Sequence, residues 1–189
     1  CSGTPTPSEI RWGSAYALKM GDGWLMFDCG PAATYKLIKS GISPLDVSHL
    51  FFTHHHSDHD ADYACFLLSR FDMSIGKEPN LKVYGPPPTR TLTEKLIGEK
   101  EGAYWHDFVA RTNHPLSLWA YQNRGGNLPR KIPKVHAADI ESGESINGPD
   151  WTIECSRGEH VQPYLDSLAY RVNTDKGSIV FSGDTRPCQ

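Results

Sequence analysis

The stretch Thr53-His54-His55-His56-Ser57-Asp58-His59 contains the pattern His-x-His-x-Asp-His, which places four potential metal ligands within six positions. The apolar run Leu50-Phe51-Phe52 just before it predicts the end of a short buried strand. Residues 62–70 after it carry apolar side chains on one helical face, which predicts a helix. The histidines are therefore expected on a strand-to-helix turn.

This spacing suits two metal ions. Alternate residues of an extended segment point to the same side, so His54 and His56 can share one cation. Asp58 and His59 follow where the chain bends, and they can reach a second cation. Imidazole suits zinc, and a carboxylate adds negative charge. The alternative is a histidine-rich surface loop without metal, but four potential ligands at this spacing favour a metal site.

Three further stretches complete a recognisable pattern: Leu25-Met26-Phe27-Asp28-Cys29-Gly30, Glu159-His160 and Phe181-Ser182-Gly183-Asp184-Thr185. With the histidine motif, and in this order, they resemble the signature of the metallo-β-lactamase superfamily of binuclear metallohydrolases. The segments Ser2-Gly3-Thr4-Pro5, Ser167-Leu168-Ala169-Tyr170-Arg171 and Ser182-Gly183-Asp184-Thr185-Arg186-Pro187 are similar to its ribonuclease Z and arylsulfatase-like branch.

The resemblance implies a fold and a set of ligands. The fold is α/β, a four-layer αβ/βα sandwich forming a single domain over residues 1–189. The implied ligands are His54, His56 and His160 for a first metal, Asp58 and His59 for a second, and Asp184 as a bridge. Two Zn²⁺ ions are expected, with Mn²⁺ or Fe²⁺ as alternatives. A hydroxide held between them would attack the substrate, and Asp58 would take its proton.

Three more residues are expected to support these ligands. Metal-bound histidines commonly donate their second ring N–H to a carboxylate or carbonyl. Asp28, at the end of the neighbouring strand, is the candidate for orienting the histidine loop, although it could also be a turn residue before Gly30. Thr53 and Thr185 are expected to position their own loops.

Composition narrows the classes of protein that fit. Hydrophobic residues make up 38% and charged residues 22% of 189 residues, which is typical of a soluble globular chain. No apolar run reaches the ~20 residues of a membrane helix. The net charge is −3 and basic residues do not cluster, which weakens the hypothesis of a nucleic-acid substrate without excluding it. Five cysteines without a Cys-x-x-Cys favour a reducing, cytoplasmic setting.

The remaining pattern alternates between strands and helices, as in layered α/β folds. Turn residues at Gly21-Asp22-Gly23 predict a hairpin. We expect strands at residues 14–20, 24–28, 81–84, 134–139, 150–155, 167–172 and 178–182, and helices at residues 32–40 and 89–98. Residues 98–130 are aromatic and predict a helical insertion overhanging the site, where its rings could line a substrate wall or simply pack together.

Two family features are not found between Cys1 and Gln189. A short strand would precede Ser2-Gly3-Thr4-Pro5, and a further metal-binding His would follow Asp184. We therefore expect the sandwich to be incomplete at both termini, and the second metal to be weakly held or completed by water.

The leading functional hypothesis is a metal-dependent phosphodiesterase of the ribonuclease Z type, acting on a nucleic-acid or small-molecule phosphodiester. A second hypothesis keeps the metals and changes the substrate to that of an arylsulfatase, lactonase or β-lactamase. A third is a non-catalytic metal-binding domain or inactive fragment. No membrane partner is expected, and a homodimer is an option that the family resemblance suggests.

Overall fold

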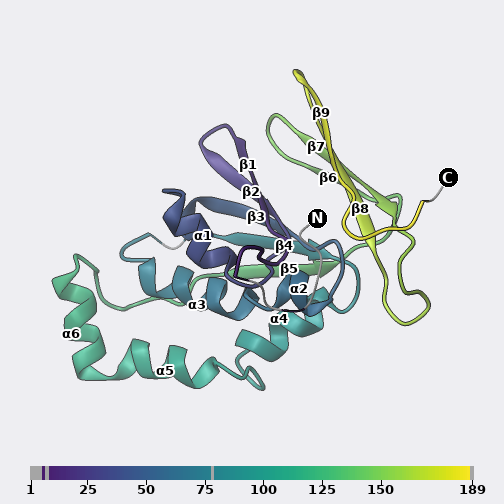
Figure 1. Ribbon diagram of the computed structural model, residues 1–189. Helices are drawn as coiled ribbons and strands as arrows, with labels where there is room; N and C mark the ends of the chain where they lie inside the picture. The colour runs from purple at the N-terminus through teal and green to yellow at the C-terminus, as the bar shows by residue number, and fades with distance from the viewer. Residues whose placement is uncertain (1–5, 7–8, 78, 188–189) are drawn as a thin grey trace.

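Two β-sheets packed face to face form the centre of the computed structural model, which describes residues 6, 9–77 and 79–187 (Figure 1). The Ser2-Gly3-Thr4-Pro5 motif, Cys1 and Cys188 lie outside these residues. The first sheet has the strand order β1-β2-β3-β4-β5, and the second has the order β6-β7-β8-β9. The strands are β1 (Tyr16–Met20), β2 (Gly23–Phe27), β3 (Val47–Phe51), β4 (Leu81–Gly85), β5 (Val135–Asp139), β6 (Ser145–Asn147), β7 (Thr152–Arg157), β8 (Leu168–Thr174) and β9 (Gly177–Phe181).

Helices cover the face of the first sheet that is turned away from the second (Figure 1). The helices of the described residues are α1 (Ala33–Lys39), the 3-10 helix η1 (Pro44–Asp46), α2 (Ser57–Asp60), α3 (Tyr63–Met73), α4 (Thr89–Ile97), α5 (Trp105–Asn113) and α6 (Pro115–Asn123). Of these, α5 and α6 lie outside the layer, beyond α3 (Figure 1). The mixed α/β class predicted from the sequence is confirmed. Among the described residues no helix covers the outer face of the second sheet, so three of the four predicted layers are present there.

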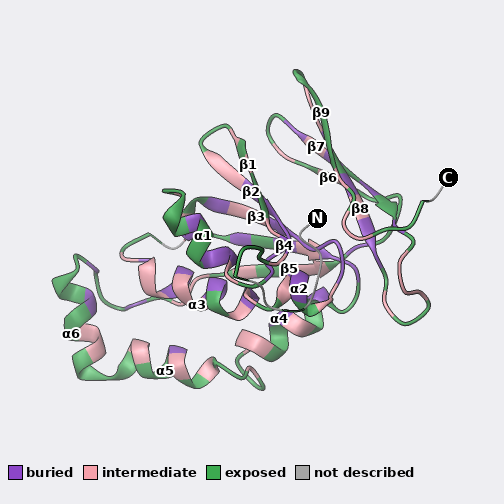
Figure 2. Ribbon diagram, viewed as in Figure 1, coloured by how far each residue is buried: buried purple, intermediate pink, exposed green. Residues whose placement is uncertain are grey.

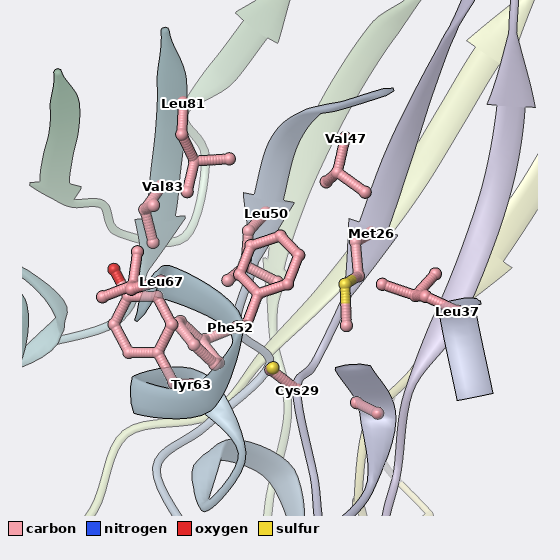
Figure 3. Close-up of a cluster of buried hydrophobic side chains, with 12 residues drawn as sticks. Met26, Cys29, Leu37, Val47, Leu50, Phe52, Tyr63, Leu67, Leu81 and Val83 are labelled. Atoms are coloured by element: carbon pink, nitrogen blue, oxygen red, sulfur yellow. The ribbon is translucent and has the colours of Figure 1, made fainter. Parts of the chain in front are cut away.

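The first sheet is apolar on both faces because it lies between two layers. On β2, Met26 points toward the helices, where it lies in a buried cluster with Leu50 and with Leu37 of α1 (Figure 3). Its neighbours Leu25 and Phe27 point the other way, into a second cluster with residues of β7 and β8. This explains the continuous apolar run of β2, which is typical of strands buried on both sides. Figure 2 shows the buried residues concentrated between these layers.

Parallel pairing sets the position of the loops. Strands β2 to β5 run parallel to one another, so their carboxyl ends meet at one edge of the sheet. Asp28 follows β2 directly, and the histidine loop follows β3. The backbone N–H of Asp28 donates to the carbonyl of Phe51 over 2.8 Å, which ties these two strand ends together. The edge where ligands bind in open α/β sheets therefore receives both motifs.

The helical insertion lies away from this edge. Phe108 of α5 packs on Phe71 of α3, with ring centroids 4.6 Å apart. Arg111 of α5 also pairs with Asp72, at 2.8 Å. Phe71 and Asp72 belong to the last turn of α3, whereas the histidine loop precedes the start of that helix. The prediction that residues 98–130 overhang the site is wrong, because the apolar surface they cover is at the far end of α3.

Two other sequence predictions need correction. Strand β6 was not expected, and it forms by antiparallel pairing with β7. The helix expected over residues 62–70 is preceded by the short helix α2, with Asp62 as the residue before α3. Among the described residues, none of the helices has the length and apolarity that crossing a membrane requires.

Tyr170 links the two sheets through a fully buried hydrogen bond. Its hydroxyl donates to the carbonyl of Phe52 over 2.6 Å. Tyr170→Phe keeps the ring but removes the donor, so we expect unfolding free energy to fall by about 1–3 kcal/mol in urea denaturation. Tyr35→Phe, on the exposed surface of α1, is the matched control. Equal stability of the two variants would contradict this role for the hydroxyl.

Candidate metal centre

The histidine loop starts where β3 ends and continues into α2. His54 and His59 are fully buried, Asp58 is nearly so, and His56 is half-buried. Side chains with this much polarity are buried only where partners or ligands satisfy them. The segments that enclose these side chains therefore determine their arrangement.

The backbone of the loop is held by two other segments. The N–H of Ser14 donates to the carbonyl of Asp58 over 2.8 Å, and the N–H of Cys29 donates to the carbonyl of His59 over 2.7 Å. A Cβ at Gly30 would lie only 2.0 Å from the Asp58 carbonyl oxygen. Glycine is thus required at position 30, because any side chain would push the loop away.

Three imidazoles converge on one point. Nδ1 of His56 lies 3.1 Å from Nε2 of His54 and 3.1 Å from Nε2 of His160. These three nitrogens are all within 4.8 Å of one another. A neutral imidazole has one donor and one acceptor nitrogen, so three rings meeting at one point cannot all satisfy each other. A cation at this point would satisfy the lone pairs of all three nitrogens.

A second group shares His54 with the first. His54, His59 and Asp184 also offer ligand atoms within 4.8 Å of one another. Nε2 of His59 is 3.6 Å from Oδ1 of Asp184 and 3.8 Å from Oδ2 of Asp58. This nitrogen is buried and has no hydrogen-bond partner in the structure. Asp58 falls outside both groups of three but faces the same nitrogen.

Asp28 and Thr53 orient the buried rings. Nδ1 of His59 lies 2.7 Å from Oδ2 of Asp28, and Nδ1 of His54 lies 3.1 Å from the Thr53 hydroxyl. That hydroxyl can in turn donate to Asp28, 3.0 Å away. With the proton of each ring on Nδ1, the Nε2 lone pairs of both histidines face the site. Asp28 has φ +59°, a left-handed conformation that Asp tolerates better than most residues.

The two remaining loops are joined to each other beside these histidines. The Thr185 hydroxyl accepts from the N–H of Glu159 over 3.0 Å, and the N–H of Arg186 donates to the carbonyl of Glu159 over 2.7 Å. These bonds fix Asp184 relative to His160. Gly183 has φ +58°, and a Cβ there would lie 2.6 Å from Cβ of Thr53.

The electrostatics of the two buried histidines differ. Burial, helped by the charges of neighbouring histidines, lowers the pKa of His54 to about 3, so this ring is neutral at pH 7. Burial also lowers the pKa of His59, but the hydrogen bond to Asp28 and the nearby carboxylates outweigh it and raise the pKa overall. Surroundings that favour a proton on His59 favour a divalent cation for the same reason.

The donor set fits metal ions. It combines neutral imidazole nitrogens, an orphaned Nε2 on His59 and carboxylate oxygens from Asp58 and Asp184, which is the chemistry that zinc and similar cations prefer. The cluster can therefore hold a metal ion. The structure brings all six residues predicted as ligands to one edge of the first sheet.

Other histidines lie outside the cluster. His55 points away from it, with Nδ1 3.1 Å from Asp60 and Nε2 2.8 Å from the Thr89 hydroxyl, so it connects the loop to the start of α4.

Sequence reasoning missed Ser14, whose hydroxyl donates to Asp28 over 3.1 Å. No motif surrounds Ser14, so only the folded chain reveals this contact.

A cleft of about 660 Å³ opens beside the cluster. His160, Asp184 and Arg186 line one part of it. Apolar and aromatic side chains line another part: Tyr16, Phe27, Ile179, Val180 and Phe181. Two of the six predicted ligands, His160 and Asp184, therefore line this cleft.

The family model for the metallo-beta-lactamase superfamily matches residues 13–187, which include the whole cluster. The chain belongs to this superfamily. The family and the fold that the sequence resemblance implied are thereby confirmed.

The chain is also similar to curated proteins that share one name. The chain is 28% identical over 187 residues to "Ribonuclease Z" of Mycobacterium sp. (strain KMS), covering 99% of this chain and 60% of that protein. It is 26% identical over 193 residues to "Ribonuclease Z" of Mycobacterium bovis (strain BCG / Pasteur 1173P2), covering 99% and 61%. The chain thus spans about 60% of the length of the curated relatives it matches.

Solved structures share the fold. The metallo-beta-lactamase fold protein YhfI from Bacillus subtilis superposes with a TM-score of 0.66 at 18% identity, covering 95% of this chain and 58% of that one. Human tRNase Z, short form, gives a TM-score of 0.61 at 20% identity, covering 96% and 66%. At these identities the likeness concerns the fold alone.

Replacing Asp28 tests whether it orients the ligands. Asp28→Asn keeps the size of the side chain but loses the carboxylate that holds His59 and Thr53. We expect zinc affinity, measured by competition with a chromophoric chelator, to fall by about 10–100-fold. Asp22→Asn, in the exposed turn between β1 and β2, is the control for loss of one negative charge. Unchanged zinc affinity in Asp28→Asn would show that the loop is positioned without this carboxylate.

Proposed function

We propose that this chain is a binuclear, zinc-dependent hydrolase that cleaves phosphodiesters, of the ribonuclease Z type. The observation that carries the proposal is the buried, unpartnered Nε2 of His59, which lies 3.6 Å from Asp184 and 3.8 Å from Asp58, beside the three converging imidazoles of the first group. A single site would leave that nitrogen without a use. The ribonuclease Z relatives support the choice of branch.

The proposed roles follow the geometry of the cluster. The first ion would be held by His54, His56 and His160, the second by Asp58 and His59, and Asp184 would contact both. Mn²⁺ or Fe²⁺ could replace zinc in such a set of nitrogen and oxygen donors. Bound zinc supplies a nucleophile by lowering the pKa of water, and it neutralises charge on the substrate oxygens.

The side chains of the protein accept a proton and position the ligands. Asp58 accepts the proton that the attacking nucleophile loses, since its carboxylate faces the same point as Nε2 of His59. Asp28 and Thr53 keep both buried rings in the tautomer that presents Nε2. Thr185 keeps the Asp184 and His160 loops together, so that the distance between the two ligand groups stays fixed.

The substrate is proposed to be a nucleic-acid or small-molecule phosphodiester. Relatives named ribonuclease Z favour RNA as the substrate. The net charge of −3 and the absence of a basic cluster in the sequence favour a substrate that contacts the protein through few phosphates. The buried, unbridged thiols of Cys29 and Cys155 suit the reducing cytoplasm. A homodimer is compatible with the proposal and is not required by it.

A small-molecule hydrolase of arylsulfatase, lactonase or β-lactamase type is the second candidate. The apolar wall of the cleft favours it, because small-molecule sites are concave and mostly apolar with a few polar groups. The two candidates share the metals and differ in the bond that is cleaved.

Hydrolysis of three chromogenic substrates separates these candidates. With zinc or manganese added, we expect turnover of bis(p-nitrophenyl) phosphate to exceed that of p-nitrophenyl sulfate and of a chromogenic cephalosporin. Preference for the sulfate or the cephalosporin would favour the second candidate. No turnover of any of them by metal-loaded protein would contradict the proposed hydrolase.

Removal of the proposed base gives a second test. Asp58→Asn should lower kcat for bis(p-nitrophenyl) phosphate by roughly 10²–10⁴-fold, the usual contribution of a positioned general base. Asp175→Asn, in the exposed turn between β8 and β9, should leave kcat unchanged. Wild-type kcat in Asp58→Asn would remove Asp58 from the mechanism.

A further inference from the structure

Arg186 is a cationic residue in the cleft beside the predicted ligands. It lines the same cleft as His160 and Asp184, and it is the single Lys or Arg among the described residues that line this cleft. Arg171 and Arg157 are also exposed, but neither is among the lining residues. Arg186 therefore differs from the other exposed arginines of the second sheet by facing the place where a substrate would enter.

The backbone of Arg186 is fixed relative to the ligands. Its N–H donates to the carbonyl of Glu159 over 2.7 Å, and its carbonyl accepts from the Thr185 hydroxyl over 2.9 Å. Glu159 directly precedes His160, and Thr185 directly follows Asp184. The base of the Arg186 side chain is thus anchored to both ligand loops, which limits where the guanidinium can go.

The guanidinium itself remains available for a ligand. In the described part of the chain it takes part in no hydrogen bond and no ion pair, whereas Arg111, Arg124 and Arg130 all contact Asp72. A guanidinium carries a permanent charge and a planar fork of donors, and it matches the oxygens of a phosphate in pairs.

We infer that Arg186 recognises the non-bridging oxygens of an anionic ester and so selects phosphodiesters over neutral esters. This inference rests on the proposed function, which it deepens by naming a residue that determines specificity. The negative charge of a phosphodiester is present before and during the reaction. Arg186 therefore contributes to binding and much less to the chemical step, and its loss raises KM and leaves kcat nearly constant.

The test compares Arg186→Gln with wild type on an anionic and a neutral ester. For bis(p-nitrophenyl) phosphate we expect KM to rise by about tenfold or more, the size of a lost charge-assisted hydrogen bond, with kcat within about threefold. KM for p-nitrophenyl acetate, which is neutral, stays at the wild-type value. Arg186→Lys keeps the charge and recovers part of the loss, and Arg171→Gln is the control for a general change of charge.

A binding measurement makes the test independent of turnover. Titration calorimetry of zinc-loaded protein with inorganic phosphate should give a Kd about tenfold weaker for Arg186→Gln than for wild type and for Arg171→Gln. Equal Kd values would overturn the inference, and so would an equal rise of KM for both esters. If wild type hydrolyses no ester, the proposed function fails, and the phosphate titration still decides the role of Arg186.

Discussion

The buried carboxylate of Asp28 is the contact on which the rest of this site depends. It accepts hydrogen bonds from Ser14, Thr53 and the ring of His59, all within 3.1 Å. An ionised carboxylate is costly to bury unless such donors surround it. Because Ser14 precedes β1 while Thr53 and His59 stand at the two ends of the histidine loop, one side chain holds these two segments and the buried ring of His59 in a single arrangement.

Sheet topology makes this arrangement possible. Parallel strands bring Asp28 and the histidine loop to the same edge, and the second sheet adds His160 and Asp184 from loops joined through Glu159 and Thr185. Glycines at positions 30 and 183 allow the backbones to approach closely where no side chain would fit. His54 and His160, which are more than a hundred residues apart in the sequence, are thus brought together by the fold itself.

Much of this could be predicted from the sequence because the signals are local. The ligand types and their spacing lie within seven residues, and the apolar runs predict the main strands, so the α/β class and the superfamily are confirmed. The roles of the individual ligands stay predictions.

What failed depends on contacts made only after folding. Strand β6 is three residues long with Ile146 as its single apolar side chain, which is too short a pattern to predict a strand, and its pairing with β7 defines it. The aromatic insertion gave no signal for its docking site, which is the last turn of α3 near Phe71. Ser14 reaches Asp28 because the hairpin of β1 and β2 brings it there, and no pattern around Ser14 could show this.

The most direct test of the account is the metal content of the purified chain, measured by elemental analysis after saturation with zinc and removal of unbound metal. Two ligand sets, His54 with His56 and His160, and Asp58 with His59, joined by Asp184, predict two equivalents of zinc per chain. His59→Ala, which removes a ligand from the second group alone, should retain one. Retention of only one equivalent by the unmodified chain would contradict the binuclear site, and retention of none would contradict metal binding by the histidine loop.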